Sequence, residues 1–191
     1  MTQQGPNAIE LYEGAVQKMI LVLSGIKPDQ LSLQTPCDKW NIHNLINHNL
    51  QVAQFAHSVL LDVEPDNAGS LSEPLPDQGA EEAFRSLTDR VLAELKMPGK
   101  LERILDTPFG TMSAGNFMMM PFSDILIHQW DLARGAGLDT AIDSSLAEVS
   151  FQALSKMVEG GRRGGLFGAE VSVPITASIQ DKLLALSGRQ P

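Results

Sequence analysis

Apolar residues recur along most of this chain with the spacing of amphipathic helices. Positions three and four apart share one face of a helix, so apolar residues at those positions predict a buried helical stripe. Glycine, proline and polar capping residues mark the ends of these segments. The pattern predicts helices over about 7–24, 42–63, 81–97, 114–134, 144–158 and 178–186. Four long amphipathic helices predict an all-α helical bundle, closed by a short C-terminal helix.

Two segments interrupt the helical pattern. Residues 64–79 are rich in proline, glycine and acidic residues, which predicts a loop that runs over the surface or forms a lip above a neighbouring site. Residues 101–113 alternate briefly between apolar and polar side chains, which predicts a short extended or irregular insertion.

Proline and glycine also predict places where the backbone departs from regular helix, within or just after the helical segments. Pro121 cannot donate a backbone hydrogen bond to Phe117, so we expect the fourth helix to kink just before Asp124. The run Gly160-Gly161-Arg162-Arg163-Gly164-Gly165 predicts a flexible segment after the fifth helix.

Composition and charge narrow the classes of function. The 191 residues, 43% apolar and 19% charged, are ordinary for one globular domain, which we expect to span 1–191. A net charge of −9 argues against nucleic-acid binding, which needs clustered basic residues. The one cysteine, Cys37, excludes an internal disulfide. The polar N-terminus and the shortness of the apolar runs predict a cytoplasmic protein without a membrane partner.

An acid and a histidine stand four residues apart on the fourth predicted helix. Asp124 and His128 therefore lie one turn apart on the same face, among the apolar residues that should be buried. Burying such groups unpaired would cost about 2–7 kcal/mol or more. A bound metal ion or a direct Asp–His hydrogen bond would each offset that cost, and the spacing alone favours the hydrogen bond.

A metal site needs further ligands from a facing helix. His48 lies on the apolar stripe of the second predicted helix, together with Leu45 and Val52, and so points inward. His43 and His57 lie about 500° and 900° around the helix from it, away from that stripe. His48, Asp124 and His128 would suit zinc or another divalent first-row metal, with a position open for water, thiol or substrate.

Several neighbouring residues have two interpretations. Cys37 is either a reactive thiol or a small filler at a helix start, and the second role is favoured because no histidine or second cysteine is close in sequence. Trp40 and Trp130 are expected to be packing residues at the starts of the ligand-bearing helices. Asp131 either pairs with Arg134 on the helix surface or supports the metal ligands.

Two motifs resemble a known family. They are Thr35-Pro36-Cys37-x-x-Trp40-x-x-x-x-Leu45-x-x-His48 and Asp124-x-x-x-His128-x-Trp130-Asp131. Their combination resembles the DinB-like superfamily, in the branch of the mycothiol-dependent maleylpyruvate isomerase metal-binding domain. The stretch from Phe167 to Arg189 resembles uncharacterised, mainly actinobacterial proteins of that branch, so the resemblance covers nearly the whole chain.

The resemblance implies a fold, a metal and a chemistry. It implies an up-and-down four-helix bundle in which His48, Asp124 and His128 hold a divalent metal, zinc or else nickel. The carboxylate of the isomerase is a glutamate, so Asp124 is one methylene shorter. The resemblance alone implies a low-molecular-weight thiol, mycothiol or bacillithiol, activated on the metal.

Three hypotheses follow for the function. The first is a metal- and thiol-dependent transferase or isomerase that acts on a small molecule as a monomer or homodimer. The second is a bundle of the same fold that binds a metal or small molecule without catalysis. In the third, Asp124 and His128 only hydrogen-bond to each other and no metal binds.

Overall fold

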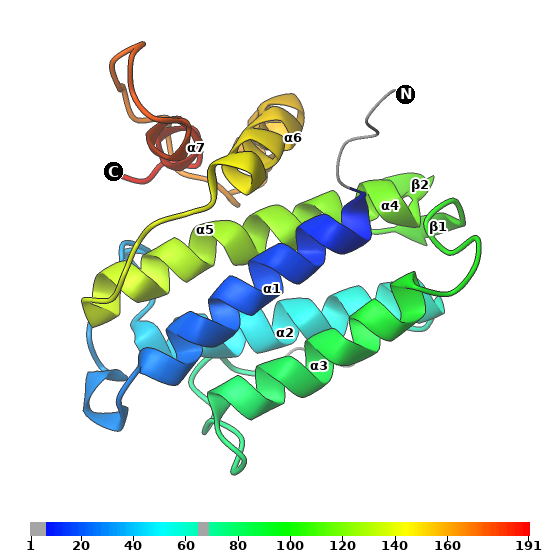
Figure 1. Ribbon diagram of the computed structural model, residues 1–191, viewed down its shortest axis with the longest axis horizontal. Helices are drawn as coiled ribbons and strands as arrows, with labels where there is room; N and C mark the ends of the chain where they lie inside the picture. The colour runs from blue at the N-terminus through cyan, green and yellow to red at the C-terminus, as the bar shows by residue number, and fades with distance from the viewer. Residues whose placement is uncertain (1–6, 65–68) are drawn as a thin grey trace.

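The computed structural model describes residues 7–64 and 69–191, and it is mostly helical (Figure 1). The α-helices are α1 (Ala8–Gly25), α2 (Ile42–Leu61), α3 (Ala80–Leu95), α4 (Ala114–Phe117), α5 (Met119–Ala136), α6 (Ser144–Arg163) and α7 (Ile179–Leu186). A 3₁₀ turn, η1 (Pro28–Gln30), and two strands, β1 (Ile104–Thr107) and β2 (Gly110–Ser113), complete the described elements. None of the helices described is long and apolar enough to cross a membrane.

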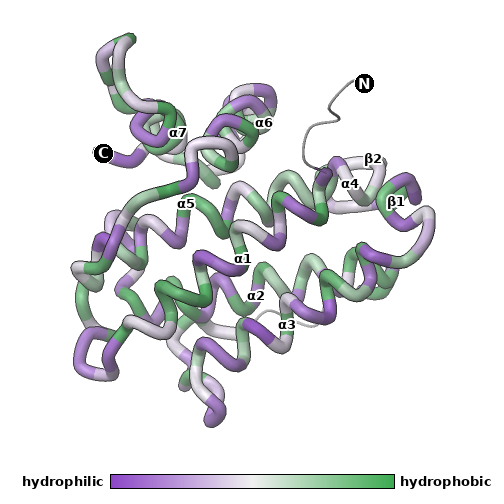
Figure 2. The backbone as a smooth tube through the Cα atoms, in the orientation of Figure 1, coloured by the Kyte–Doolittle hydropathy of each residue, from purple (hydrophilic) through white to green (hydrophobic). Residues whose placement is uncertain are grey.

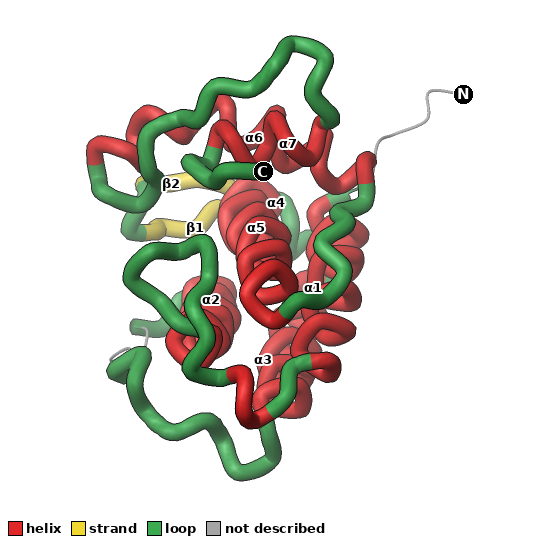
Figure 3. Tube along the Cα trace, turned by 90° about the vertical axis from the view of Figure 1, so that its left-hand side faces the viewer, coloured by secondary structure: helices red, strands yellow, loops and turns green. Residues whose placement is uncertain are grey.

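Helices α1, α2, α3 and α5 pack as a four-helix bundle. Both α1 and α2 contact α3 and α5, so the four helices form a ring in the order α1, α3, α2, α5. Figure 3 shows them nearly end on, with α6 and α7 stacked on the outside beyond α5. The prediction of an all-α, DinB-like fold with a short extended insertion and a short last helix is confirmed.

The directions of the four bundle helices do not simply alternate. Figure 1 shows α1 and α5 running one way and α2 and α3 running the other, so the consecutive helices α2 and α3 are parallel. This is sterically allowed because the connection after α2 is long enough to return to the start of that helix. Leu71 and Glu73 of this connection accept hydrogen bonds from Asn44 and Asn47, in the first turns of α2.

The bundle interior is mainly apolar. The largest fully buried side chains among the described residues include the aromatic residues Tyr12 of α1, Phe84 of α3, Phe117 of α4 and Phe122 of α5, and α2 adds Ile42, Leu45, Ile46 and Leu60. Figure 2 shows apolar positions alternating with polar ones along every bundle helix, as the sequence pattern requires. Polar side chains cap the helices: Asn7, Asn41, Asp143 and Ser178 each accept backbone N–H bonds at a first turn.

The predicted fourth helix is two helices. α4 ends at Phe117 and α5 begins at Met119, so Pro121 stands in the first turn of α5 and not in the interior of a longer helix. Proline is tolerated there because the first N–H groups of a helix have no intrahelical partner. The expected kink just before Asp124 is therefore a helix boundary at Met118, and α5 continues past Asp124.

Helix α6 is longer than predicted. It continues through Gly160 and Gly161 to Arg163, where the sequence predicts a flexible segment. The Arg162 guanidinium donates to the carbonyl oxygens of Gly168 and Leu186, which ties the last turn of α6 to the C-terminal segment. Tertiary contacts thus outweigh the low helix propensity of glycine.

The connection between α2 and α3 is irregular as predicted, over its described residues 62–64 and 69–79. Residues 65–68, in the middle of that predicted loop, lie outside the described residues, as do residues 1–6 of the polar N-terminus. The predicted extended insertion is an antiparallel hairpin in which Ile104 pairs with Ser113 and Thr107 with Gly110.

Candidate metal centre

Helices α2 and α5 bring His48, Asp124 and His128 together. The Nε2 atom of His48 lies 3.2 Å from Oδ2 of Asp124, and the Nε2 atom of His128 lies 3.4 Å from Oδ1 of the same carboxylate. The candidate ligand atoms of the three side chains all lie within 4.8 Å of one another. His43 and His57 are absent from this cluster, in keeping with their angular positions on the helix.

These distances suit a shared divalent ion. Zinc bonds to imidazole nitrogen and carboxylate oxygen are about 2.0–2.2 Å long, which puts tetrahedral ligand atoms about 3.4 Å apart. The two measured separations, 3.2 and 3.4 Å, are close to that edge length. The two imidazole rings meet nearly edge to face, at 81°, and their Nε2 atoms lie beside different oxygens of the carboxylate. The donor set and its geometry fit the implied metal.

The cluster has one covered side and one open side. The side chain of His128 is 8% exposed, whereas those of His48 and Asp124 are 22% and 33% exposed. The sequence pattern predicts that His48 points into the core, but the structure places its side chain at the edge of the interior. The cluster therefore reaches the surface at Asp124 and His48.

The charges of the cluster depend on one another. Burial would raise the pKa of Asp124, but the adjacent imidazoles of His128 and His48 outweigh burial and hold that pKa below its usual range. Burial would lower the pKa of His128, and its contacts with Asp124, Asp131 and Cys37 instead raise that pKa well above the ordinary 6.5. Without a metal, the cluster is an ion pair that holds a proton.

Asp131 supports the ligands from behind. It is fully buried, and its Oδ2 atom lies 2.9 Å from Nδ1 of His128. A carboxylate on one ring nitrogen fixes the proton there and leaves the other nitrogen free for a metal. Of the two partners considered for Asp131, the structure has the candidate ligand His128, whereas Arg134 lies over the Trp130 ring, 5.8 Å from its centroid.

Arg189 is the cation that balances Asp131. Its Nη2 and Nε atoms donate to the two carboxylate oxygens of Asp131 over 2.9 and 3.3 Å. Burial would raise the pKa of Asp131, yet the bonds from His128 and Arg189 lower it to about 2. Sequence reasoning missed Arg189, because a residue in the irregular C-terminal segment belongs to no periodic pattern.

Cys37 also belongs to this polar network. Its Sγ atom lies 3.2 Å from Oδ2 of Asp131, 3.8 Å from Nδ1 of His128 and 3.2 Å from Nη2 of Arg189. Cys37, His128 and Asp131 offer a second set of close ligand atoms. The guanidinium of Arg189 already contacts two of them, and its positive charge disfavours a second cation at this place.

The loop that leads into α2 covers the imidazoles. The Trp40 ring centroid lies 4.6 Å from that of His48 and 5.9 Å from that of His128. Thr35 fixes the loop, because its hydroxyl donates to the Trp40 carbonyl oxygen over 2.7 Å and accepts from the Cys37 N–H over 3.2 Å. The spacing of threonine, cysteine and tryptophan in the first motif therefore has a structural cause.

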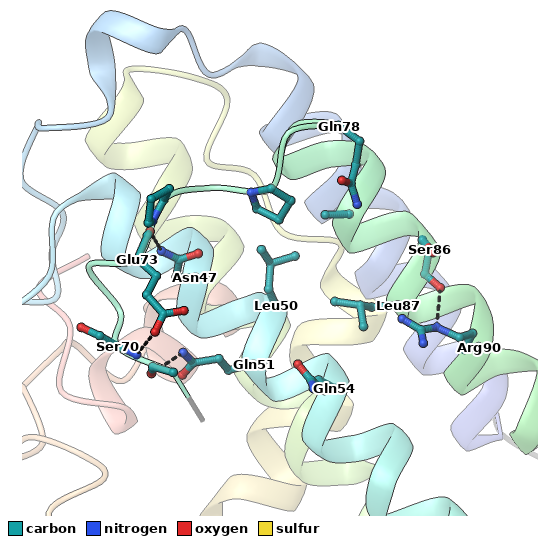
Figure 4. Close-up of a pocket in the computed structure, with 14 residues that line it drawn as sticks. Asn47, Leu50, Gln51, Gln54, Ser70, Glu73, Gln78, Ser86, Leu87 and Arg90 are labelled. Atoms are coloured by element: carbon teal, nitrogen blue, oxygen red, sulfur yellow. Dashed lines mark hydrogen bonds between the residues drawn. The ribbon is translucent and has the colours of Figure 1, made fainter. Parts of the chain in front are cut away.

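A cavity of about 320 Å³ lies elsewhere, between α2, α3 and residues 69–78 (Figure 4). None of the three cluster residues lines it. Its polar groups bond to one another: Asn47 donates to the Glu73 carbonyl, Gln51 to the Gly69 carbonyl, and the Glu73 carboxylate accepts from the Ser70 N–H. These bonds anchor the described part of the connection to α2.

Comparisons with known proteins agree with this architecture. Two crystal structures, of a mycothiol-dependent maleylpyruvate isomerase and of a histidine-to-alanine variant of such an enzyme, superpose with TM-scores of 0.61 and 0.60. They are 15% and 13% identical in sequence, and each superposition covers 90% of this chain and 76% of the other. The likeness therefore shows a common fold.

Sequence relatives and a family model extend the comparison. Two uncharacterized proteins, MT0763 and Rv0738 from two strains of Mycobacterium tuberculosis, are 29% identical over 184 residues, which cover 93% of this chain and 95% of each relative. The model of the mycothiol maleylpyruvate isomerase N-terminal domain matches residues 13–133, which include all three clustered side chains. The chain belongs to the family of the mycothiol maleylpyruvate isomerase N-terminal domain.

Proposed function

We propose that this protein binds a divalent metal through His48, Asp124 and His128, and uses it as a thiol-dependent transferase or isomerase. The observation that carries the proposal is the convergence of two Nε2 atoms on one carboxylate, with Asp131 bonded to the far side of the His128 ring. Family membership supports the thiol dependence.

The chain's own groups have separate tasks in this proposal. His48 and His128 offer neutral nitrogen ligands, and Asp124 offsets part of the metal charge. Asp124 is shorter than a glutamate by one methylene, but it already lies within 3.4 Å of both Nε2 atoms, so its reach is sufficient. When bound, the metal would lower the pKa of a thiol or water at its open position.

Zinc is the preferred metal and nickel the alternative, because imidazole nitrogens suit both. Mycothiol is the preferred thiol, since the family takes its name from a mycothiol enzyme, and bacillithiol is the alternative. The substrate would be a small molecule with an electrophilic centre that a thiolate can attack.

A non-catalytic binding bundle is the second candidate. The two charged groups behind His128, the buried Asp131 and the half-buried Arg189, are bonded to each other, and neither is free to exchange a proton with a substrate. A protein of this kind would load metal and a small molecule without turning it over.

Metal content tests the site. We expect protein purified without chelator to carry about one zinc or nickel per chain by elemental analysis, and expect His48→Ala and His128→Ala to lose it. His57→Ala is the matched control, because it removes a histidine of the same helix outside the cluster. If the metal content of the two cluster variants equalled that of the wild type, the contacts of Asp124 with the histidines would be hydrogen bonds alone.

Thiol transfer tests the activity. Metal-loaded protein with mycothiol and a panel of small electrophiles should consume the thiol or isomerise the electrophile, and His128→Ala should not. Stoichiometric metal without turnover of any panel member would favour the binding bundle. Full turnover by His128→Ala would contradict a metal-dependent reaction.

A further inference from the structure

Apolar side chains lead away from the open side of the metal cluster along α2. His48, Val52 and Phe55 stand three or four residues apart, so they share one face of that helix. The side chain of His48 is 22% exposed, and Val52 and Phe55 are half-buried, so this face reaches the surface. From His48 to Phe55 the helix rises about 10 Å.

The segment that faces α2 continues this apolar surface. Figure 1 shows α5 antiparallel to α2. His48 contacts Asp124 at one end, and the Phe55 ring centroid lies 6.1 Å from that of Phe117, the last residue of α4, at the other. These two contacts fix the register, and the half-buried Met120 lies between them, one turn before Asp124.

Phe109 completes the apolar surface at the turn of the hairpin. It is 51% exposed, and its ring meets that of Phe55 nearly edge to face, at 85°, with the centroids 6.4 Å apart. Figure 3 shows both strands of the hairpin beside α5 and above α2. Adjoining exposed apolar residues mark binding surfaces, whereas scattered ones are common. Val52, Phe55, Phe109 and Met120 together form the apolar strip.

The segments that hold the apolar strip carry no acid and no strong base. Neither residues 42–61 nor residues 107–123 contain Asp, Glu, Lys or Arg. Asp131 and Arg189, behind His128, are bonded to each other. A ligand with a charged body would lose hydration on the strip without gaining an ion pair from these segments, so the strip favours an uncharged apolar body.

We propose that the apolar strip binds an uncharged alkyl or aryl arm of the substrate, whose electrophilic end reaches the metal cluster. The inference rests on the proposed function, because it takes the cluster as the reactive end. Four side chains over about 10 Å suit the arm of a small molecule, whereas a typical protein interface takes about 20–30 residues from each partner. Val52 and Phe109 then select the substrate without taking part in the chemistry.

Two hydroxamates test this proposal, because their oxygen atoms can bind zinc while the arm is varied. We expect the hydroxamate of phenylpentanoic acid to bind the zinc-loaded protein about 10–100-fold more tightly than acetohydroxamate, as measured by isothermal titration calorimetry. In nitrogen–proton correlation spectra, the long compound should shift the Val52, Phe55 and Phe109 amide signals, and acetohydroxamate should not.

Variants of the strip should change the ratio of the two affinities. Phe109→Ser should lower that ratio at least about fivefold. Val52→Thr, which keeps the shape of the side chain, should lower it too and replaces Phe109→Ser if the hairpin does not fold. Leu166→Ser is the matched control, because Leu166 is 66% exposed and lies outside the strip; it should keep the wild-type ratio.

The outcomes separate this proposal from the metal centre. Equal affinities of the two hydroxamates, or a wild-type ratio in both strip variants, would overturn the proposal and leave the metal centre standing. A protein that takes up no zinc and binds neither compound would overturn the proposed function, and this inference with it. A dimer that Phe109→Ser converts to monomers in sedimentation would assign the strip to a second copy of the chain and overturn the proposal.

Discussion

Asp131 is a buried carboxylate that three neighbours share. It has no exposed surface, and it contacts His128, Arg189 and Cys37 over 2.9–3.2 Å. A buried charge is costly unless it is paired and hydrogen-bonded, and here both conditions are met. Because Asp131 bonds to Nδ1 of His128, it helps to fix the orientation of that ring and therefore the direction of its Nε2 atom.

Asp131→Asn removes this charge with little change of shape. The amide has no charge and one acceptor oxygen, for which Nδ1 of His128 and Arg189 would compete, so we expect metal affinity to fall about 10–100-fold. Competition with a fluorescent zinc chelator measures the change. Asp139→Asn, which neutralises an exposed acid on the connection before α6, should keep wild-type affinity; an equal loss there would point to net charge and not to Asp131.

The pKa shifts predict opposite pH trends with and without metal. The folded-state pKa of His128 lies above 6.5, so its stabilising effect on metal-free protein is complete below pH 6.5 and is lost as the pH rises through that higher pKa. Metal binding requires the neutral ring, so bound zinc should stabilise the protein increasingly over the same rise.

Urea unfolding between pH 6 and 9, with and without zinc, checks both trends. His128→Ala should abolish the zinc-dependent rise, and His43→Ala, on the same helix as His48, should keep it. A zinc-dependent rise that survives His128→Ala would remove His128 from the ligand set.

At the scale of elements, two glycines in helices should respond oppositely to alanine. A Cβ at Gly135 of α5 would lie 2.9 Å from the Gln34 carbonyl oxygen, in the loop that carries Cys37 and Trp40. A Cβ at Gly160 of α6 would meet nothing within 4 Å. Gly135 is therefore needed for close approach, and Gly160 is not.

Gly135→Ala should destabilise the protein by about 1–3 kcal/mol, because the loop must move. Gly160→Ala should stabilise it by about 0.5–1 kcal/mol, because alanine favours the helix. Chemical denaturation of the two variants measures the change in unfolding free energy and its sign in each. A stabilised Gly135→Ala would show that the loop moves at little cost.

Helical periodicity predicts most of the elements but not their exact ends. The apolar spacing and the capping residues predict α1, α2, α3 and α7 to within a few residues, and they predict the start of α6. Periodicity does not predict the break at Met118, because that break depends on how the turn before Pro121 is capped. It does not predict that α6 continues through Gly160 either, because that depends on contacts with α7.

The candidate site was predicted in part. Helix angles select His48, Asp124 and His128, and the structure brings those side chains together; their binding of a metal stays a prediction. Arg189 and Cys37 reach the same place through irregular segments, where no repeat relates sequence position to direction.

At the scale of the whole molecule, Arg189 joins the C-terminal segment to the bundle. Its side chain donates to Asp131 on α5, to Cys37 before α2, and to the Ser187 carbonyl. Segments distant in sequence therefore meet at one guanidinium, directly behind the His128 ring.

Arg189→Met keeps the length of the side chain and removes its charge. The buried carboxylate of Asp131 would lose its cation, so we expect a loss of about 3–5 kcal/mol in unfolding free energy, together with weaker metal binding. Thermal unfolding and chelator competition measure the two effects. Arg163→Met, at an exposed position at the end of α6, should match the wild type in both.

Trp40 gives the molecule a built-in optical reporter. Its indole lies against His48 and close to His128, whereas Trp130, the other tryptophan, is 2% exposed on α5. The protonated ring of His128 should quench the emission of Trp40, and zinc binding, which needs the neutral ring, should relieve the quenching. We therefore expect zinc binding at the cluster to change the intrinsic fluorescence without a label, and expect Trp40→Phe to lose this change while Trp130 still emits.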